Sequence, residues 1–118
     1  MNNVYTPDTW KVIKIDSVEF PLTYKVFACW YGGFFASDSW KLNSGITKVT
    51  KEITKEDVYY LFEGHSGSIY RCHEKAYGSS MYGSTILHGI IKKSKEIGTT
   101  IEILPENTNW LDLDYKIS

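Results

Sequence analysis

The chain has 118 residues, of which 42% are hydrophobic and 23% are charged, and its formal net charge at pH 7 is −1. These values are typical of a globular protein and exclude a disordered chain, a collagen-like repeat and a disulfide-dense miniprotein. The length matches one domain, so we expect residues 1–118 to form a single globular unit. No apolar stretch is long enough to span a bilayer, and the first residues lack a signal-peptide pattern. We therefore expect a cytoplasmic protein without a membrane partner.

Charge and cysteine content narrow the classes of partner. Basic and acidic residues are spread evenly over both halves of the chain, and Arg71 is the only arginine. Duplex nucleic acid is therefore not an expected partner, because its binding depends on clustered cations and on bidentate arginine contacts. In a reducing compartment we expect Cys29 and Cys72 to be free thiols.

The first two thirds of the chain contain runs of β-branched and aromatic residues that predict strands. Gly32-Gly33, Asn43-Ser44-Gly45 and the loop 64–68 supply turn residues between these runs. The lysines of residues 46–53 indicate an edge strand. In chain order, the predicted strands are residues 10–16, 24–31, 34–42, 46–53, 58–63 and 69–73.

The pattern becomes helical over residues 80–97, with isoleucines on one face and lysines on the other. Ser79 or Ser80 is placed to cap the start of this helix, and Gly98 to end it. Gly83 and Gly89 inside the helix predict the close approach of a sheet strand or of a second copy in a homodimer. A last strand at 99–104 and a tail at 107–118 follow, and we expect this tail to dock on the sheet. The predicted fold is α+β, with one amphipathic helix packed on an antiparallel meander sheet of five or six strands.

The sequence contains no metal, cofactor or catalytic motif. Cys72 and His73 are adjacent in a predicted strand, so their side chains point to opposite faces and cannot share a metal ion or form a dyad. We therefore expect no metal, no cofactor and no enzymatic activity. A small enzyme is the alternative, because the residues of a catalytic triad can be distant in the sequence and meet only in the fold.

The segment 64–85 has the composition of an anion site. It is rich in Gly, Ser and Tyr, and it leads into the start of the predicted helix, where unpaired N–H groups favour anions. The alternative is a Gly/Ser loop that only caps the helix. The candidate ligand-binding or partner-binding residues are Trp40, Arg71, His73, Lys75, Tyr77, Ser79, Ser80 and Tyr82.

Two stretches, DSWKLNSGI at residues 38–46 and GHSGSIYRCH at residues 64–73, resemble the small accessory proteins of tailed bacteriophages. The resemblance implies a short, mostly non-enzymatic protein that inhibits a host factor, including host defence systems, or sequesters a nucleotide signal. The first functional hypothesis is an inhibitor that contacts a host protein through exposed Tyr and Trp residues. The alternative is capture of a small nucleotide or other anionic ligand at the helix N-terminus.

Overall fold

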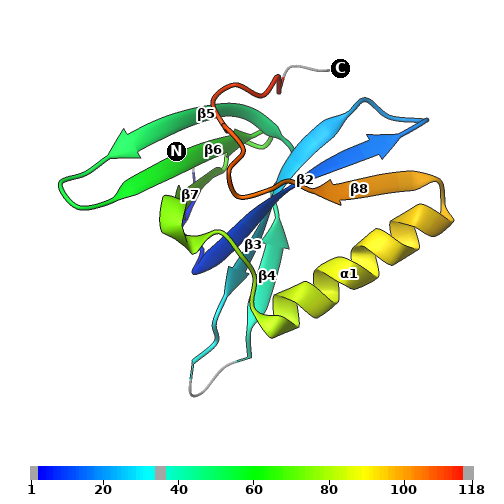
Figure 1. Cartoon of the computed structure of the whole chain (residues 1–118), viewed down its shortest axis with the longest axis horizontal. Coiled ribbons are helices and arrows are strands. Elements are labelled where there is room, and N and C mark those ends of the chain that lie inside the picture. The colour runs from blue at the N-terminus through cyan, green and yellow to red at the C-terminus, as the bar shows by residue number, and fades with distance from the viewer. Residues whose placement is uncertain (1–2, 34–36, 116–118) are drawn as a thin grey trace.

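The computed structural model describes residues 3–33 and 37–115. Its fold is α+β, with one long helix and two four-stranded sheets (Figure 1). In chain order the elements are β1 (Val4–Tyr5), β2 (Thr9–Ser17), β3 (Thr23–Trp30), β4 (Ser39–Leu42), β5 (Ile46–Ile53), β6 (Val58–Gly64), β7 (Ile69–His73), the 3₁₀ helix η1 (Glu74–Ala76), α1 (Met81–Glu96) and β8 (Thr99–Ile103).

The strands form two separate sheets. The central sheet has the order β4-β3-β2-β8, and the outer sheet has the order β1-β7-β6-β5. One hydrophobic cluster joins the two sheets and contains Val12 and Val26, whereas a second cluster joins the central sheet to α1 and contains Ile13 and Phe27. The central sheet is therefore covered by the outer sheet on one face and by α1 on the other.

The prediction of a single sheet of five or six strands was wrong. The physical reason lies in β2 and β3, whose side chains are apolar on both faces, so that one helix cannot cover them. The chain leaves the central sheet after β4 and enters the outer sheet at β5, through a turn in which Gly45 has a φ of +118°. This backbone angle favours glycine, which has no Cβ to clash with the neighbouring carbonyl.

The predicted strands otherwise agree with the structure. The predicted edge strand is confirmed as β5, which lies at the edge of the outer sheet, and the hairpin of β6 and β7 is confirmed. Of the third predicted strand, 34–42, residues 34–36 lie outside the described residues, Ser37 and Asp38 are not in a strand, and the rest forms β4. The sequence did not reveal β1, a two-residue strand that pairs in parallel with β7.

Helix α1 begins where the sequence predicted. The Ser80 side chain accepts a hydrogen bond from the Gly83 backbone N–H and caps the helix. A Cβ atom on Gly83 would lie 2.5 Å from the Cys29 Sγ of β3, which confirms a strand in close approach at this position. A Cβ atom on Gly89 would meet no atom within 4 Å, so the prediction that a strand approaches closely is wrong at this position. The alternative prediction, a second copy in a homodimer, stays a prediction.

The C-terminal tail packs against the cluster between the sheets. Trp110 is 3% exposed, and its ring centroid lies 5.5 Å from that of Trp10. Both cysteines are free and buried, and they lie in different clusters, Cys29 beneath α1 and Cys72 between the sheets. No helix among the described residues has the length and apolar character that a bilayer span requires.

Candidate functional site

The start of α1 is capped by a serine side chain. Ser80 is 7% exposed, and its hydroxyl accepts the Gly83 N–H at 3.0 Å. The Ser79 and Ser84 hydroxyls lie 2.6 Å apart. Because the Ser80 hydroxyl already accepts one of the first-turn N–H groups, the geometry favours the capping interpretation of this segment.

The predicted binding residues Arg71 and His73 are engaged elsewhere. The Arg71 Nε donates to the Glu52 Oε1 at 2.7 Å, and its guanidinium carbon lies 3.6 Å from the centroid of the Tyr59 ring. This hydrogen bond to the Glu52 carboxylate raises the pKa of Arg71 above its usual value. Arg71 is therefore held across β7, β6 and β5 of the outer sheet and is not aimed at the start of α1.

Both ring nitrogens of His73 have partners. The Nε2 lies 2.8 Å from the Asp57 Oδ1, and the Nδ1 accepts the Lys75 backbone N–H at 3.0 Å. The second contact caps η1, so His73 and the exposed Lys75 belong to a local turn after β7.

The predicted aromatic residues lie in three different surroundings. The Tyr77 hydroxyl accepts the Val12 N–H and donates to the Leu104 carbonyl, and burial raises the pKa of Tyr77 to about 12. Trp40 stacks on Phe27 with 5.6 Å between ring centroids, whereas Tyr82 is exposed on α1. The eight residues predicted from the sequence therefore do not converge on one site.

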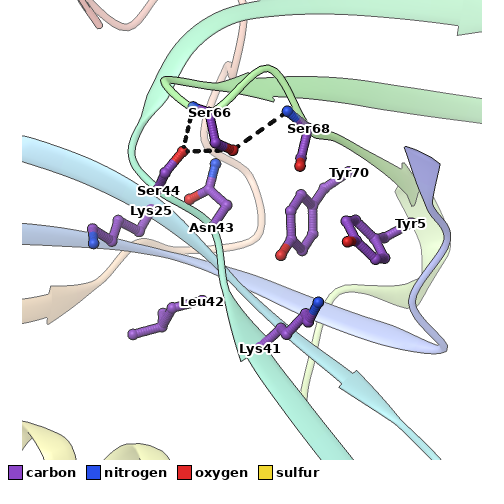
Figure 2. Close-up of a pocket in the computed structure, with 9 residues that line it drawn as sticks. All are labelled: Tyr5, Lys25, Lys41, Leu42, Asn43, Ser44, Ser66, Ser68 and Tyr70. Atoms are coloured by element: carbon purple, nitrogen blue, oxygen red, sulfur yellow. Dashed lines mark hydrogen bonds between the residues drawn. The ribbon is translucent and has the colours of Figure 1, made fainter. Parts of the chain in front are cut away.

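A different place has the geometry of a ligand site, at the junction of the two sheets. It is a pocket of about 380 Å³, which we call the Asn43 pocket (Figure 2). Its walls come from β1, β3, β4, β7 and the turns that follow β4 and β6. Its lining residues are Tyr5, Lys25, Lys41, Leu42, Asn43, Ser44, Ser66, Ser68 and Tyr70.

Asn43 is the most unusual residue of this pocket. It is only 4% exposed, its Oδ1 accepts the Val26 N–H at 2.9 Å, and its own backbone N–H donates to the Val26 carbonyl. Its Nδ2 is buried and has no hydrogen-bond partner among the described residues. A buried amide donor without a partner costs about 1–3 kcal/mol, and an acceptor that reached this group would offset that cost.

Serines fix the turn that closes one side of the Asn43 pocket. The Ser66 backbone N–H donates to the Ser44 Oγ at 2.9 Å, and the two hydroxyl oxygens lie 3.2 Å apart, as the dashed lines of Figure 2 show. These bonds join the turn after β6 to the turn after β4. In Figure 2 the Ser68 hydroxyl points toward the space beside Tyr70 and adds a further donor.

Two tyrosines and a lysine form the other side. The rings of Tyr5 and Tyr70 lie 5.2 Å apart, and the Lys41 Nζ lies 4.3 Å from the Tyr5 ring centroid. Burial raises the pKa of Tyr70, with smaller contributions from Tyr5 and Cys72, so its hydroxyl keeps its proton at neutral pH. A neutral phenol is a hydrogen-bond donor as well as an acceptor.

The charge of the Asn43 pocket is positive and uncompensated. Lys25 and Lys41 both line it, and no aspartate or glutamate does. Within residues 3–33 and 37–115 neither lysine has a carboxylate at ion-pair distance. The pocket is therefore lined by two lysines and several hydroxyl-bearing side chains, and the buried Asn43 amide lies in its wall.

Sequence reasoning treated the pocket residues as turns and strands and did not group them. One signal was present, because all lining residues except Tyr5 and Lys25 fall within the stretches 38–46 and 64–73. The elements that join these stretches, namely the β6–β7 hairpin and the crossing after β4, are visible only in the structure.

Comparison with known proteins gives no relative for this chain, since no protein-family model, no curated protein and no solved structure matches it. No cluster of three or more potential metal ligands occurs in the part of the chain that the structure describes.

Proposed function

We propose that this chain is a non-enzymatic binding protein that captures a small anionic ligand in the Asn43 pocket. The observation that carries the proposal is the buried Asn43 Nδ2 without a hydrogen-bond partner among the described residues. A ligand oxygen at this position would satisfy the amide and remove the cost of leaving it unpaired.

The hydrogen-bonding character of the lining supports an anion over a cation or a neutral apolar molecule. The Asn43 Oδ1 is already used by the Val26 N–H, so only the amide hydrogens are available to a ligand. Lys25 and Lys41 contribute donors alone. A ligand must therefore bring acceptors, and negative charge on them strengthens each bond.

The same lining supports binding without catalysis. Its described residues include no histidine, cysteine or carboxylate that would act as a general base at neutral pH. Lys41 is engaged by the Tyr5 ring, with 4.3 Å between its Nζ and the ring centroid. The resemblance to phage accessory proteins implies either inhibition of a host factor or sequestration of a nucleotide signal, and the Asn43 pocket suits the second.

Contact with a host protein is the second candidate function. The hairpin between β2 and β3 favours it, because Val18 is 96% exposed and Phe20 is 69% exposed. The tryptophans give less support to contact with a host protein, because Trp10 and Trp110 are buried in the core. Loss of a co-purifying host protein on Phe20→Ser, with the pocket unchanged, would support this candidate.

The proposed function is tested by native mass spectrometry of gently purified protein, combined with calorimetric titration of fructose 6-phosphate. We expect a co-purifying anionic small molecule or saturable binding of the probe. Asn43→Asp should abolish it, because a carboxylate replaces the donor amide while the oxygen that accepts the Val26 N–H is kept. Asn107→Asp, an exposed residue of the tail, is the matched control.

Thermal unfolding of both variants separates a binding defect from a folding defect. Lys41→Met offers a second test if Asn43→Asp does not fold, because it removes the charge and keeps most of the side-chain volume. Absence of any bound anion together with no heat of binding in the wild-type protein would overturn the proposal.

A further inference from the structure

Resting on the proposed function, we infer that the ligand of the Asn43 pocket carries two separated anionic groups, one at Lys41 and one at Lys25. The juxtaposition that carries this inference is the approach of the two lysines to one pocket from opposite faces of the central sheet.

The sheet register places the lysines on these opposite faces. Lys41 pairs with Ala28, which belongs to the cluster between the two sheets. Lys25 pairs with Ile13, which belongs to the cluster beneath α1. Directly paired residues of an antiparallel ladder project from the same face, so Lys41 lies on the face toward the outer sheet and Lys25 on the face toward α1.

Figure 2 shows the result of this register at the pocket. The Lys41 ammonium points toward Tyr70 and Tyr5, whereas Lys25 lies on the other side of Asn43, beside Ser44. Lys41 is further held by its contact with the Tyr5 ring at 4.3 Å. The two lysines therefore line the pocket on opposite sides of Asn43, whose unpartnered amide nitrogen is directed toward Ser44 and Ser66 in Figure 2.

A single small anion does not satisfy this arrangement. If it binds beside Lys41, the Lys25 ammonium stays unpaired, and the reverse holds at the other end. The pocket volume of about 380 Å³ lies in the range of sites for whole organic molecules. An organic molecule with an anionic group at each end pairs both lysines and brings polar atoms past Asn43.

The anionic groups are phosphates or carboxylates, since both accept from lysine, hydroxyl and amide donors. Fructose 1,6-bisphosphate and fructose 6-phosphate form a matched pair of probes that differ in one phosphate. Glutarate and its monomethyl ester form the corresponding carboxylate pair, and inorganic phosphate represents a single free anion.

We expect the two-anion member of one pair to bind at least about tenfold more tightly than its one-anion partner in calorimetric titration, the effect of one added charge-assisted contact. The pair that shows this ratio identifies the anionic group. Lys25→Met and Lys41→Met should each abolish the preference for the two-anion probe. Lys55→Met, an exposed lysine in the turn before β6, should leave it unchanged.

The outcomes separate this inference from the function on which it rests. Equal affinity for one-anion and two-anion probes would overturn the inference and leave the proposed function standing. The same conclusion follows if Lys25→Met binds the two-anion probe as tightly as the wild-type protein does. Absence of binding by every probe in the folded wild-type protein would overturn both.

Discussion

Substitution of Gly83 by alanine tests the packing of α1 on the central sheet. An alanine normally stabilises a helix by about 1 kcal/mol relative to glycine. At Gly83 the new Cβ would lie 2.5 Å from the Cys29 Sγ and 3.2 Å from the Ser80 Oγ, so the helix or the strand must move. Overpacking of this kind costs about 1–3 kcal/mol.

Gly89→Ala is the matched control on the same helix, because its Cβ meets no atom within 4 Å. It should raise the free energy of unfolding by about 1 kcal/mol. Since both variants gain the same helix propensity, the difference between them isolates the overpacking cost at Gly83. We expect Gly89→Ala to be more stable than Gly83→Ala by about 1–3 kcal/mol.

Urea denaturation followed by circular dichroism measures both values. Cys29→Ala should partly rescue Gly83→Ala, because it removes the sulfur that the new Cβ approaches, and the double-mutant cycle should show a favourable coupling of about 1–2 kcal/mol. Equal stabilisation by Gly83→Ala and Gly89→Ala would refute the close approach of α1 to β3. A Gly89→Ala variant that loses a dimer seen for the wild-type protein would instead support the homodimer.

Three further predictions concern groups outside the Asn43 pocket. Burial raises the pKa of Tyr77 from 10.0 in the unfolded chain to about 12 in the folded protein, so its contribution to stability is complete below pH 10 and is lost as the pH rises toward 12. Urea denaturation across this pH range should show the loss. The Tyr77→Phe variant has no titrating hydroxyl at this position and should lose less stability. Burial raises the pKa of Cys29 and of Cys72, so a thiol reagent at pH 8 should label neither thiol in the native protein and both thiols in urea. Rapid labelling of either thiol in the native protein would contradict their burial. Arg71→Ala should lower the free energy of unfolding by about 1 kcal/mol, because it removes the partly exposed ion pair with Glu52 and the contact with Tyr59. It should leave anion binding in the Asn43 pocket unchanged. A loss of anion affinity in this variant would show that Arg71 contributes to the binding site.

Much of the local structure follows from the sequence because it depends on near neighbours. The lysines of residues 46–53 and the glycines of the loop 64–68 predicted β5 and the β6–β7 hairpin, and Ser79 or Ser80 predicted the start of α1, which Ser80 caps. The apolar run of β3 also carried information about layers, since Val26 and Phe27 point to opposite faces and both are fully buried. Such a run indicates a strand covered on both sides.

The site was harder to predict because its parts meet only through tertiary contacts. Arg71 and His73 have the chemistry of anion ligands, but their partners Glu52 and Asp57 lie elsewhere in the sequence and pair with them across the outer sheet. The Asn43 pocket is the converse case, because its residues were not predicted as a site and the fold brings them together. Tyr5 reaches it only through the short pairing of β1 with β7, and Lys25 reaches it from the far face of β3.

The most direct test of the central claim is the side-chain amide resonance of Asn43 in a ¹⁵N-labelled sample titrated with fructose 1,6-bisphosphate. The account predicts a saturable downfield shift of the Asn43 amide protons, because the free Nδ2 donor acquires an acceptor. The side-chain amide of Asn109, which already donates to Asp112, should not move. Saturable shifts confined to the Ser79–Ser84 region, with the Asn43 resonance unchanged, would contradict the account and place the anion at the start of α1.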